Sequence, residues 1–235
     1  MPGTFLPSTS TQYIKFDFDG LLKSCESLFG NLSFFDTWKN YWLNVFLEQD
    51  EAIKEYMKKF PDTNPIVQRM KLIPKQNQPL DGYELYTFEH VTDYGTFYFH
   101  FDIAAMNYLK HHQHIPVQEI DLSDIYIDPD TIFLEDKIHD QRFPYFVRMY
   151  GTEKPYLCVD GNKRITSRIK QGHKKFQGYV FTPEHIQNVF FGSFEVFYYV
   201  FLYECDLMYR TIQETSDENE VLRCTQLYLQ ANFNG

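Results

Sequence analysis

The residues best suited to do chemistry lie in one stretch, between Tyr156 and Phe181, which reads YLCVDGNKRITSRIKQGHKKFQGYVF. Its pattern is a short strand, an Asp160-Gly161 turn, a helix beginning at Asn162 and a second strand. Glycine tolerates a positive φ and lets another group come close to the backbone. The unpaired N–H groups at a helix start suit an anion. This arrangement indicates recognition of a phosphate group.

The charge of the same stretch supports an anion site. The whole chain has a formal net charge of −10, yet the segment from 163 to 175 contains no Asp or Glu. Its six cations are Lys163, Arg164, Arg168, Lys170, Lys174 and Lys175. The alternative is that Asp160 or Asn162 simply caps a helix whose basic face is solvated, which needs no ligand, because short turn motifs have many false positives.

The overall composition limits the classes of function. The chain has 235 residues, of which 43% are hydrophobic and 18% aromatic, enough for one large or two small domains with a sizeable core. Aromatic enrichment favours core packing, with a partner surface as the alternative. The acidic balance makes nucleic acid an unlikely partner. The most apolar window, 189–203, contains Gly192, Ser193 and Glu195 and is too short to span a bilayer.

Cysteines and histidines predict neither a metal site nor a redox site. The four cysteines form no CxxC pair, and Cys158 is expected to be a small core residue. His111, His112 and His114 form HHQH, but neighbouring histidines on a helix point in different directions, so a polar helix end is expected. The opening MPGTFLPSTSTQ lacks the features of a secretory signal. We therefore expect an intracellular, cytoplasmic protein with reduced thiols.

The N-terminal half must supply elements that cover this stretch. Residues 1–15 are expected to form a loose or edge-bound arm, and 61–82 a loop rich in proline. Between them, aromatic residues at spacings of three and four predict a helix with Ser33 as N-cap. Alternation over 83–101 with a turn at 93–95 predicts a β-hairpin, followed by a short helix over 103–110.

The second half alternates strand-like and helical pieces. VQEIDL and DIYID are expected as strands or extended segments, 142–149 as a short helix, and YLCV and FQGYVF as strands. Thr182 is expected to cap a helix, with Pro183 in its first turn. Helices should continue to about Leu229, although the aromatic run 194–203 also fits a strand.

These residues resemble those of the ParB/sulfiredoxin-like superfamily. Members have a strand, a (D)GxxR motif at a helix start, a helix ending in glycine and a closing strand. Here VDGNKR, Gly172 and the strand 178–181 follow that order, and IPVQEIDLSDIYIDP resembles the opening strand and loop. The resemblance covers about residues 115–182. It implies an α+β protein with a small mixed α/β core at 115–182, an N-terminal helical and hairpin extension at 1–114, and a C-terminal helical region at 183–235.

The resemblance also implies a ligand and a set of residues. In the family the helix start binds nucleotide phosphates: ATP in sulfiredoxins and free-serine kinases, CTP in partition proteins. Gly161 and Arg164 match that site, while Asn162 and Lys163 stand where the kinase-like DGHHR version has two histidines. Sulfiredoxins need a cysteine at the Asn162 position, so sulfinic-acid reduction is not expected. The residues expected to bind the cofactor are Gly161, Asn162, Lys163, Arg164 and Arg168.

Phosphoryl transfer would need a carboxylate as base or metal ligand. Asp160 matches the acid of the kinase-like motif, and Asp128, Asp130 and Glu135 lie where the family's N-terminal loop approaches the nucleotide. The catalytic candidates are therefore Asp160, Asp128 and Asp130, with Mg²⁺ accompanying ATP or CTP. Turn and cap roles explain these acids equally well.

Two functional interpretations follow. The first is a protein that binds a nucleotide or a phosphorylated small molecule, such as a small-molecule kinase or nucleotide hydrolase. The second is a non-catalytic protein-interaction module on the same fold. A role in DNA partitioning is third, because SDENE at 216–220 makes the C-terminal part acidic.

Overall fold

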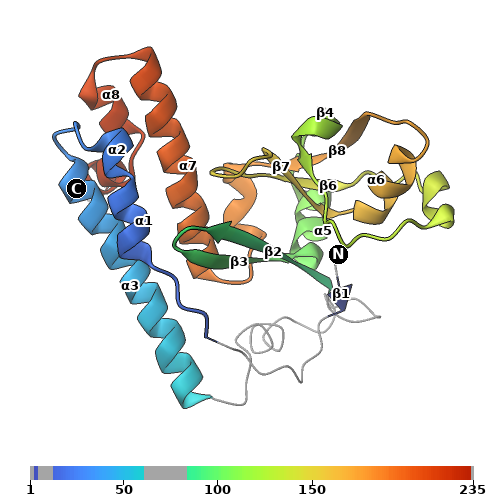
Figure 1. The fold of residues 1–235 in the computed structure, drawn as a ribbon, viewed down its shortest axis with the longest axis horizontal. Coiled ribbons are helices and arrows are strands. Elements are labelled where there is room, and N and C mark those ends of the chain that lie inside the picture. The colour runs from blue at the N-terminus through green and yellow to red at the C-terminus, as the bar shows by residue number, and fades with distance from the viewer. Residues whose placement is uncertain (1–2, 5–12, 61–83, 234–235) are drawn as a thin grey trace.

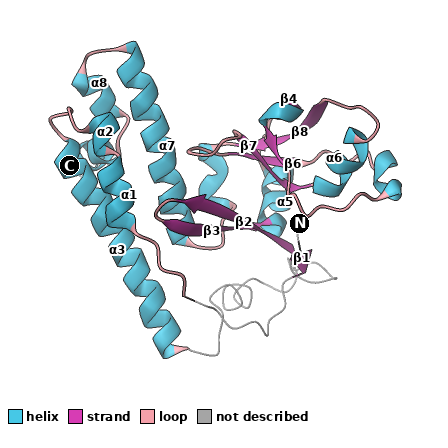
Figure 2. Ribbon diagram, in the orientation of Figure 1, coloured by secondary structure: helices cyan, strands magenta, loops and turns pink. Residues whose placement is uncertain are grey.

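The computed structural model describes residues 3–4, 13–60 and 84–233. Most of the expected N-terminal arm and the expected loop at 61–82 lie outside these residues. The described chain combines helices with two sheets, a mixed α and β fold (Figure 1; Figure 2). None of its helices is both long and apolar enough to cross a membrane.

The N-terminal helices are α1 (Phe18–Ser24), α2 (Glu26–Phe29) and α3 (Phe35–Lys59). The predicted helix is confirmed, and its stripe of Trp38, Trp42 and Phe46 is fully buried at four-residue spacing. The predicted N-cap is wrong, because Phe34 occupies that position. The Ser33 hydroxyl instead donates to the Glu218 carboxylate, 2.6 Å away, and so joins this turn to the C-terminal region.

The predicted hairpin consists of β2 (Glu84–Thr92) and β3 (Gly95–Asp102), and β1 (Gly3–Thr4) pairs with the start of β2. Its turn needs a glycine, since Gly95 has a φ of +130°. On β3 the side chains of Phe97, Phe99 and Phe101 are buried on one face. Asp102 then caps α5 (Ile103–His112), its carboxylate accepting the Ala105 N–H at 2.8 Å.

The larger sheet has five strands in the order β4-β8-β6-β7-β5. Along the chain, β4 (Val117–Asp121), the 3-10 helix η2 (Leu122–Asp124), β5 (Ile125–Tyr126) and the 3-10 helix η3 (Glu135–His139) precede β6 (Tyr145–Arg148). Then come β7 (Tyr156–Asp160), α6 (Asn162–Ile169) and β8 (Lys175–Phe181). Strand β6 is antiparallel to β7 and parallel to β8.

The predicted helix over 142–149 is wrong, because this segment contains the central strand β6. Tyr145, Phe146 and Val147 are all buried, since both faces of this strand are covered. Such a continuous apolar run lacks the alternation that distinguishes a strand from a buried helix.

The C-terminal region is helical, as predicted. The 3-10 helix η4 (Pro183–Asn188) starts at the Thr182 cap, followed by α7 (Ser193–Glu214), α8 (Glu218–Arg223) and α9 (Gln226–Phe233). The aromatic run at 194–203 is therefore helix and not strand. Helices α3 and α7 pack side by side, and the hairpin lies between them and the five-stranded sheet (Figure 1).

Two apolar clusters lie on opposite faces of the five-stranded sheet. The smaller joins α6 to one face through Ile165, Phe146 and Cys158. The larger runs from α3 and the hairpin through α7 to Val147 and Val159 on the other face. The larger cluster therefore contains residues from all three expected segments, 1–114, 115–182 and 183–235. The division of the chain into these segments stays a prediction.

Candidate functional site: the start of helix α6

The turn between β7 and α6 has the backbone geometry that the sequence predicts. Gly161 has a φ of +99°, in the left-handed region, and α6 starts at Asn162. A Cβ at Gly161 would lie 2.7 Å from the Cβ of Pro144 and 2.9 Å from Nη2 of Arg164. The groups that approach this glycine are thus parts of the protein itself, and both the backbone conformation and this close packing require glycine.

The first N–H groups of α6 are not capped. No side-chain cap is present, and among the described residues no acceptor takes the backbone N–H groups of Asn162, Lys163 and Arg164. The first internal bond is the one from Ile165 N–H to the Gly161 carbonyl, at 3.0 Å. The start of α6 thus has unpaired donors and the positive end of the helix dipole, which suit an anion, but Gly161, Asn162 and Arg164 are buried and only Lys163 is half-exposed.

Arg164 is a buried link between two acids. Its side chain is 6% exposed; Nη2 donates to the Asp160 carboxylate at 2.8 Å, and Nη1 lies 3.7 Å from that of Asp140. Its Nε is buried without a hydrogen-bond partner in the described chain. Arg142 also binds Asp140, at 2.7 Å. This hydrogen bond, assisted by the charge of Arg164, holds the pKa of Asp140 well below its ordinary value.

Two other predicted ligand-binding side chains also have protein partners. Asn162 is buried; its Nδ2 donates to the Cys158 carbonyl at 2.8 Å and its Oδ1 accepts the Asp128 N–H at 3.1 Å. Arg168 donates to the backbone carbonyl of Asp140. These contacts tie α6 to β7 and to the loop between β5 and β6.

Lys163 is the exception among the predicted residues. It is half-buried, and it forms no ion pair or side-chain hydrogen bond with any described residue. Around Arg164, three acids (Glu84, Asp140 and Asp160) face two arginines (Arg142 and Arg164), and Lys163 adds a further cation in the first turn of α6.

The predicted carboxylates have structural partners. Asp160 pairs with Arg164, and Asp128 accepts the Asp130 N–H at 2.9 Å in a local turn. Burial raises the pKa of the Cys158 thiol well above its ordinary value, with smaller contributions from Asp160 and Asp128. Glu135 is exposed at the start of η3.

The described chain contains no group of three or more His, Cys, Asp or Glu side chains placed to hold one metal ion. In the HHQH segment, Nδ1 of His112 lies 2.8 Å from the Tyr108 carbonyl oxygen, and its ring stacks on that of Tyr108 at 3.9 Å. All three histidines of this segment are exposed.

Several residues at the site were not among the sequence candidates: Glu84, Asp140, Arg142, Pro144 and Tyr145. Partial desolvation raises the pKa of Glu84, and Asp160 adds to this effect. Burial, then Asp160, likewise raises the pKa of Tyr145. Glu84 at the start of β2 and Tyr145 at the start of β6 are therefore both within electrostatic range of Asp160. The segment DQRFPYF carries no recognisable motif that could have revealed this.

No family model matches the chain, and no curated protein or solved structure matches it either. The ParB/sulfiredoxin-like assignment therefore stays a prediction that rests on the residues of β7, α6 and β8 and on the upstream segment 115–129.

Proposed function

We propose that this protein binds a nucleotide, ATP or CTP, or another phosphate-bearing small molecule at the start of α6, on a ParB/sulfiredoxin-like unit. The observation that carries the proposal is the uncapped N-terminus of α6, which follows the left-handed Gly161 and has the unpaired Lys163 beside it. Backbone N–H groups and the helix dipole favour an anion at such a position.

The order of elements supports the fold assignment within this proposal. Strand β7 leads through Asp160-Gly161 into α6, which is followed by Gly172 with a φ of +87° and by strand β8. Strand, glycine turn, helix, glycine and closing strand are the features on which the resemblance rests.

The two neighbouring cations would have different roles in this proposal. Lys163 would neutralise the phosphate, because no described acid pairs with it. Arg164 would act as a positioning residue, because Asp160 and Asp140 already compensate its charge and it fixes the start of α6 against the loop before β6. Glu84 and Asp160 add negative charge nearby, so a ligand with few negative charges, or one accompanied by Mg²⁺, would bind best.

Mg²⁺ would enter with the nucleotide phosphates. It commonly keeps several waters and takes only one or two protein carboxylates. Asp160 faces the Arg164 guanidinium, which competes with a cation, while Asp128 accepts the Asp130 N–H in a local turn. The described acids form no preformed metal cage, so the proposal covers binding; kinase or hydrolase activity would need Asp160, Asp128 or Asp130 to act once the ligand is in place.

The test is calorimetric titration of the full chain with ATP, CTP and pyrophosphate, with and without Mg²⁺. A charge-assisted hydrogen bond contributes about 1.5 kcal/mol or more, so Lys163→Ala should weaken binding by about tenfold or more. The matched control is Lys174→Ala, an exposed cation in the loop between α6 and β8, which should change the affinity less than twofold. Failure of all three ligands to bind at millimolar concentration would refute the proposal, as would equal effects of the two substitutions.

A further inference from the structure

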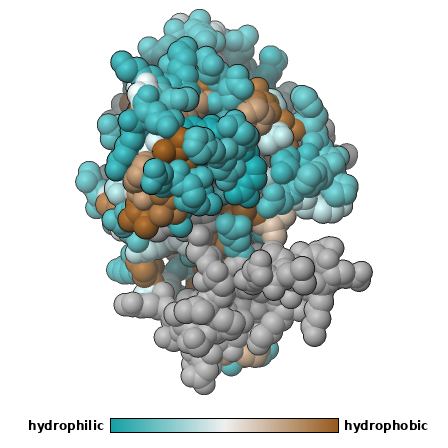
Figure 3. All heavy atoms as spheres, turned by 90° about the vertical axis from the view of Figure 1, so that its right-hand side faces the viewer, coloured by the Kyte–Doolittle hydropathy of each residue, from teal (hydrophilic) through white to brown (hydrophobic). Residues whose placement is uncertain are grey.

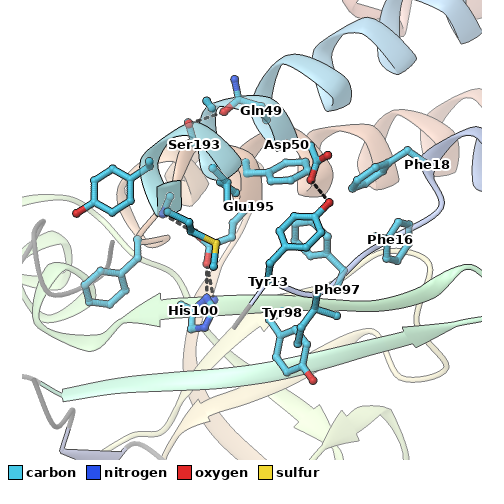
Figure 4. Close-up of a pocket in the computed structure, with 18 of the residues that line it drawn as sticks. Tyr13, Phe16, Phe18, Gln49, Asp50, Phe97, Tyr98, His100, Ser193 and Glu195 are labelled. Atoms are coloured by element: carbon cyan, nitrogen blue, oxygen red, sulfur yellow. Dashed lines mark hydrogen bonds and ion pairs between the residues drawn. The ribbon is translucent and has the colours of Figure 1, made fainter. Parts of the chain in front are cut away.

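A second site lies away from α6, in a cleft of about 610 Å³ between the C-terminal half of α3, the start of α7 and strand β3 (Figure 4). The segment from Tyr13 to Phe18 closes a further side. Small-molecule pockets in proteins have volumes of about 300–1,000 Å³ and are mostly apolar with a few placed polar groups. The cleft has the size and the composition of such a pocket.

Aromatic rings from three separate segments form the apolar wall. Phe97 of β3 and Phe194 of α7 meet edge to face, with ring centroids 5.3 Å apart. Phe18 of α1 lies 5.3 Å from Phe194 as well. Rings held in this way form a rigid apolar wall that an apolar molecule can contact.

A histidine held by a buried glutamate provides a polar group in the wall. Nδ1 of His100 lies 2.7 Å from Oε1 of Glu195, whose residue is 6% exposed (Figure 4). The same carboxylate accepts the backbone N–H groups of His100, at 2.8 Å, and of Gly192. Because an ionised carboxylate only accepts, it fixes the proton of a neutral His100 on Nδ1 and leaves the lone pair on Nε2. Nε2 has no partner among the described residues.

Two pairs of the other polar groups in the wall are engaged with each other, while the buried Tyr56 hydroxyl has no hydrogen-bond partner among the described residues. The Tyr13 hydroxyl donates to the Asp50 carboxylate at 2.8 Å, and that carboxylate also pairs with Lys54 at 2.6 Å. The Ser193 hydroxyl donates to the side-chain oxygen of Gln49 at 2.7 Å. Ser193 is therefore not positioned by His100 as a nucleophile, and the geometry describes a binding site.

From this arrangement we infer that the cleft binds a small organic molecule with a flat apolar body and an N–H or O–H donor, either neutral or cationic, as in an aromatic amine. The rings contact the apolar body, and His100, which projects from the face of β3 opposite to Phe97, accepts the donor through Nε2 at the edge of this strand. The carboxylates of Asp50 and Glu195 make an anion unfavourable, which separates this ligand from the phosphate ligand of α6. The inference does not depend on the function proposed for that site.

Three probes that share one ring system test this inference: tryptamine, tryptophol and indole-3-acetate. They present a cation, a neutral hydroxyl and an anion on the same body. Titration of the full chain, followed by ligand-observed NMR, should show binding of tryptamine and tryptophol, and at least tenfold weaker binding of indole-3-acetate. Absence of tryptamine binding at millimolar concentration, or equal affinity for the acetate, would overturn the inference.

Substitutions locate the bound probe. Ala52 lines the cleft from an exposed position on α3, so Ala52→Trp should fill the space and abolish tryptamine binding. Glu55→Trp, on the same helix but outside the lining, is the matched control and should leave the affinity unchanged. His100→Phe should weaken binding of both tryptamine and tryptophol by about tenfold, the effect of one hydrogen bond. Lys163→Ala should leave the affinity for tryptamine unchanged. Unchanged tryptamine affinity in Ala52→Trp would mean that the probe binds outside the cleft and would overturn the inference.

Discussion

Replacement of Arg164 by methionine separates a structural role from a ligand-binding role. Methionine has a similar length but no charge, so Arg164→Met leaves Asp160 and Asp140 without the cation that lies 2.8 Å and 3.7 Å from them. The two carboxylates are only 24% and 14% exposed, so water can replace that cation only in part.

The expected loss of stability can be bounded. Removal of one partner of a buried ion pair costs about 3–5 kcal/mol. Asp140 keeps its hydrogen bond to Arg142, and Asp160 retains some solvent contact, so we expect the low end of this range, about 3 kcal/mol. The double variant Arg164→Met with Asp160→Asn also removes the carboxylate charge that is left without its partner. Its loss of stability should be about 1–2 kcal/mol smaller than the sum of the two single losses, and this difference is the coupling energy.

The assay is urea unfolding at pH 7, followed by circular dichroism, with the free energy of unfolding compared between variants. Lys163→Met is the matched control, since Lys163 is the neighbouring cation without a described partner; it should lower stability by less than about 0.5 kcal/mol. A loss below about 1 kcal/mol for Arg164→Met would mean that the pair is effectively solvated, as in surface ion pairs. If the losses of the two single variants simply add in the double variant, Arg164 and Asp160 do not stabilise each other, and the prediction is wrong.

Three further predictions concern the same region. Gly161→Ala should lower the free energy of unfolding by about 2 kcal/mol in the same urea assay, because its φ of +99° and the 2.7 Å approach of Pro144 both oppose a Cβ. The depressed pKa of Asp140 stabilises the folded state above about pH 5, and this contribution is lost as the pH falls. Arg142→Ala removes the main cause of the depressed pKa. In acid titrations, the free energy of unfolding of this variant should therefore decline less steeply between about pH 5 and pH 2. Cys158→Ala should cost about 1 kcal/mol through a small cavity, measured by thermal unfolding, and leave ligand affinity unchanged in calorimetry.

The elements that the sequence predicted well are those fixed by local signals. In the hairpin, alternation along β3 and a glycine turn at Gly95 specify both strands and their register. In β7, α6 and β8, the glycines at 161 and 172 mark both ends of the helix. These signals act over a few residues, so they can be recognised without knowledge of the rest of the chain.

The central strand β6 shows where local signals fail. Its residues Tyr145, Phe146 and Val147 are buried on both faces, and their pairing with β7 and β8 depends on residues up to 34 positions away, as in the pairing of Tyr145 with Tyr179. A strand that is paired and buried in this way shows no two-residue alternation of apolar and polar residues in the sequence.

The same reason explains which part of the α6 site could be predicted. Gly161, Asn162 and Arg164 lie within one turn of chain, and their spacing is a local signal. Asp140 and Glu84 reach the site from a loop and from the start of another sheet, so only the folded chain brings them to Arg164 and Asp160. The cleft at His100 and Glu195 has no sequence signal at all, because these residues are 95 positions apart.

The positions of the aromatic residues bear on the alternative function, a protein-interaction module. Their abundance fitted either a packed core or a partner surface, and the structure uses many of them in the core. The largest fully buried side chains are all aromatic, among them Trp38, Phe99 and Tyr198. Phe97 stacks on Tyr198 with ring centroids 4.1 Å apart, which joins the hairpin to α7.

The exposed surface agrees with this assignment. Above the residues drawn in grey, the face in Figure 3 is mainly hydrophilic, with apolar side chains in small separate patches. The large exposed apolar side chains of the described chain come from many different elements, among them Leu47 on α3, Val91 at the end of β2 and Tyr209 on α7. Scattered apolar residues are normal on a protein surface and do not mark an interface. The aromatic excess thus lends no support to an interaction module. Among the described residues no group accepts the first N–H groups of α6 or pairs with Lys163, and packing does not explain this; the proposed anionic ligand would.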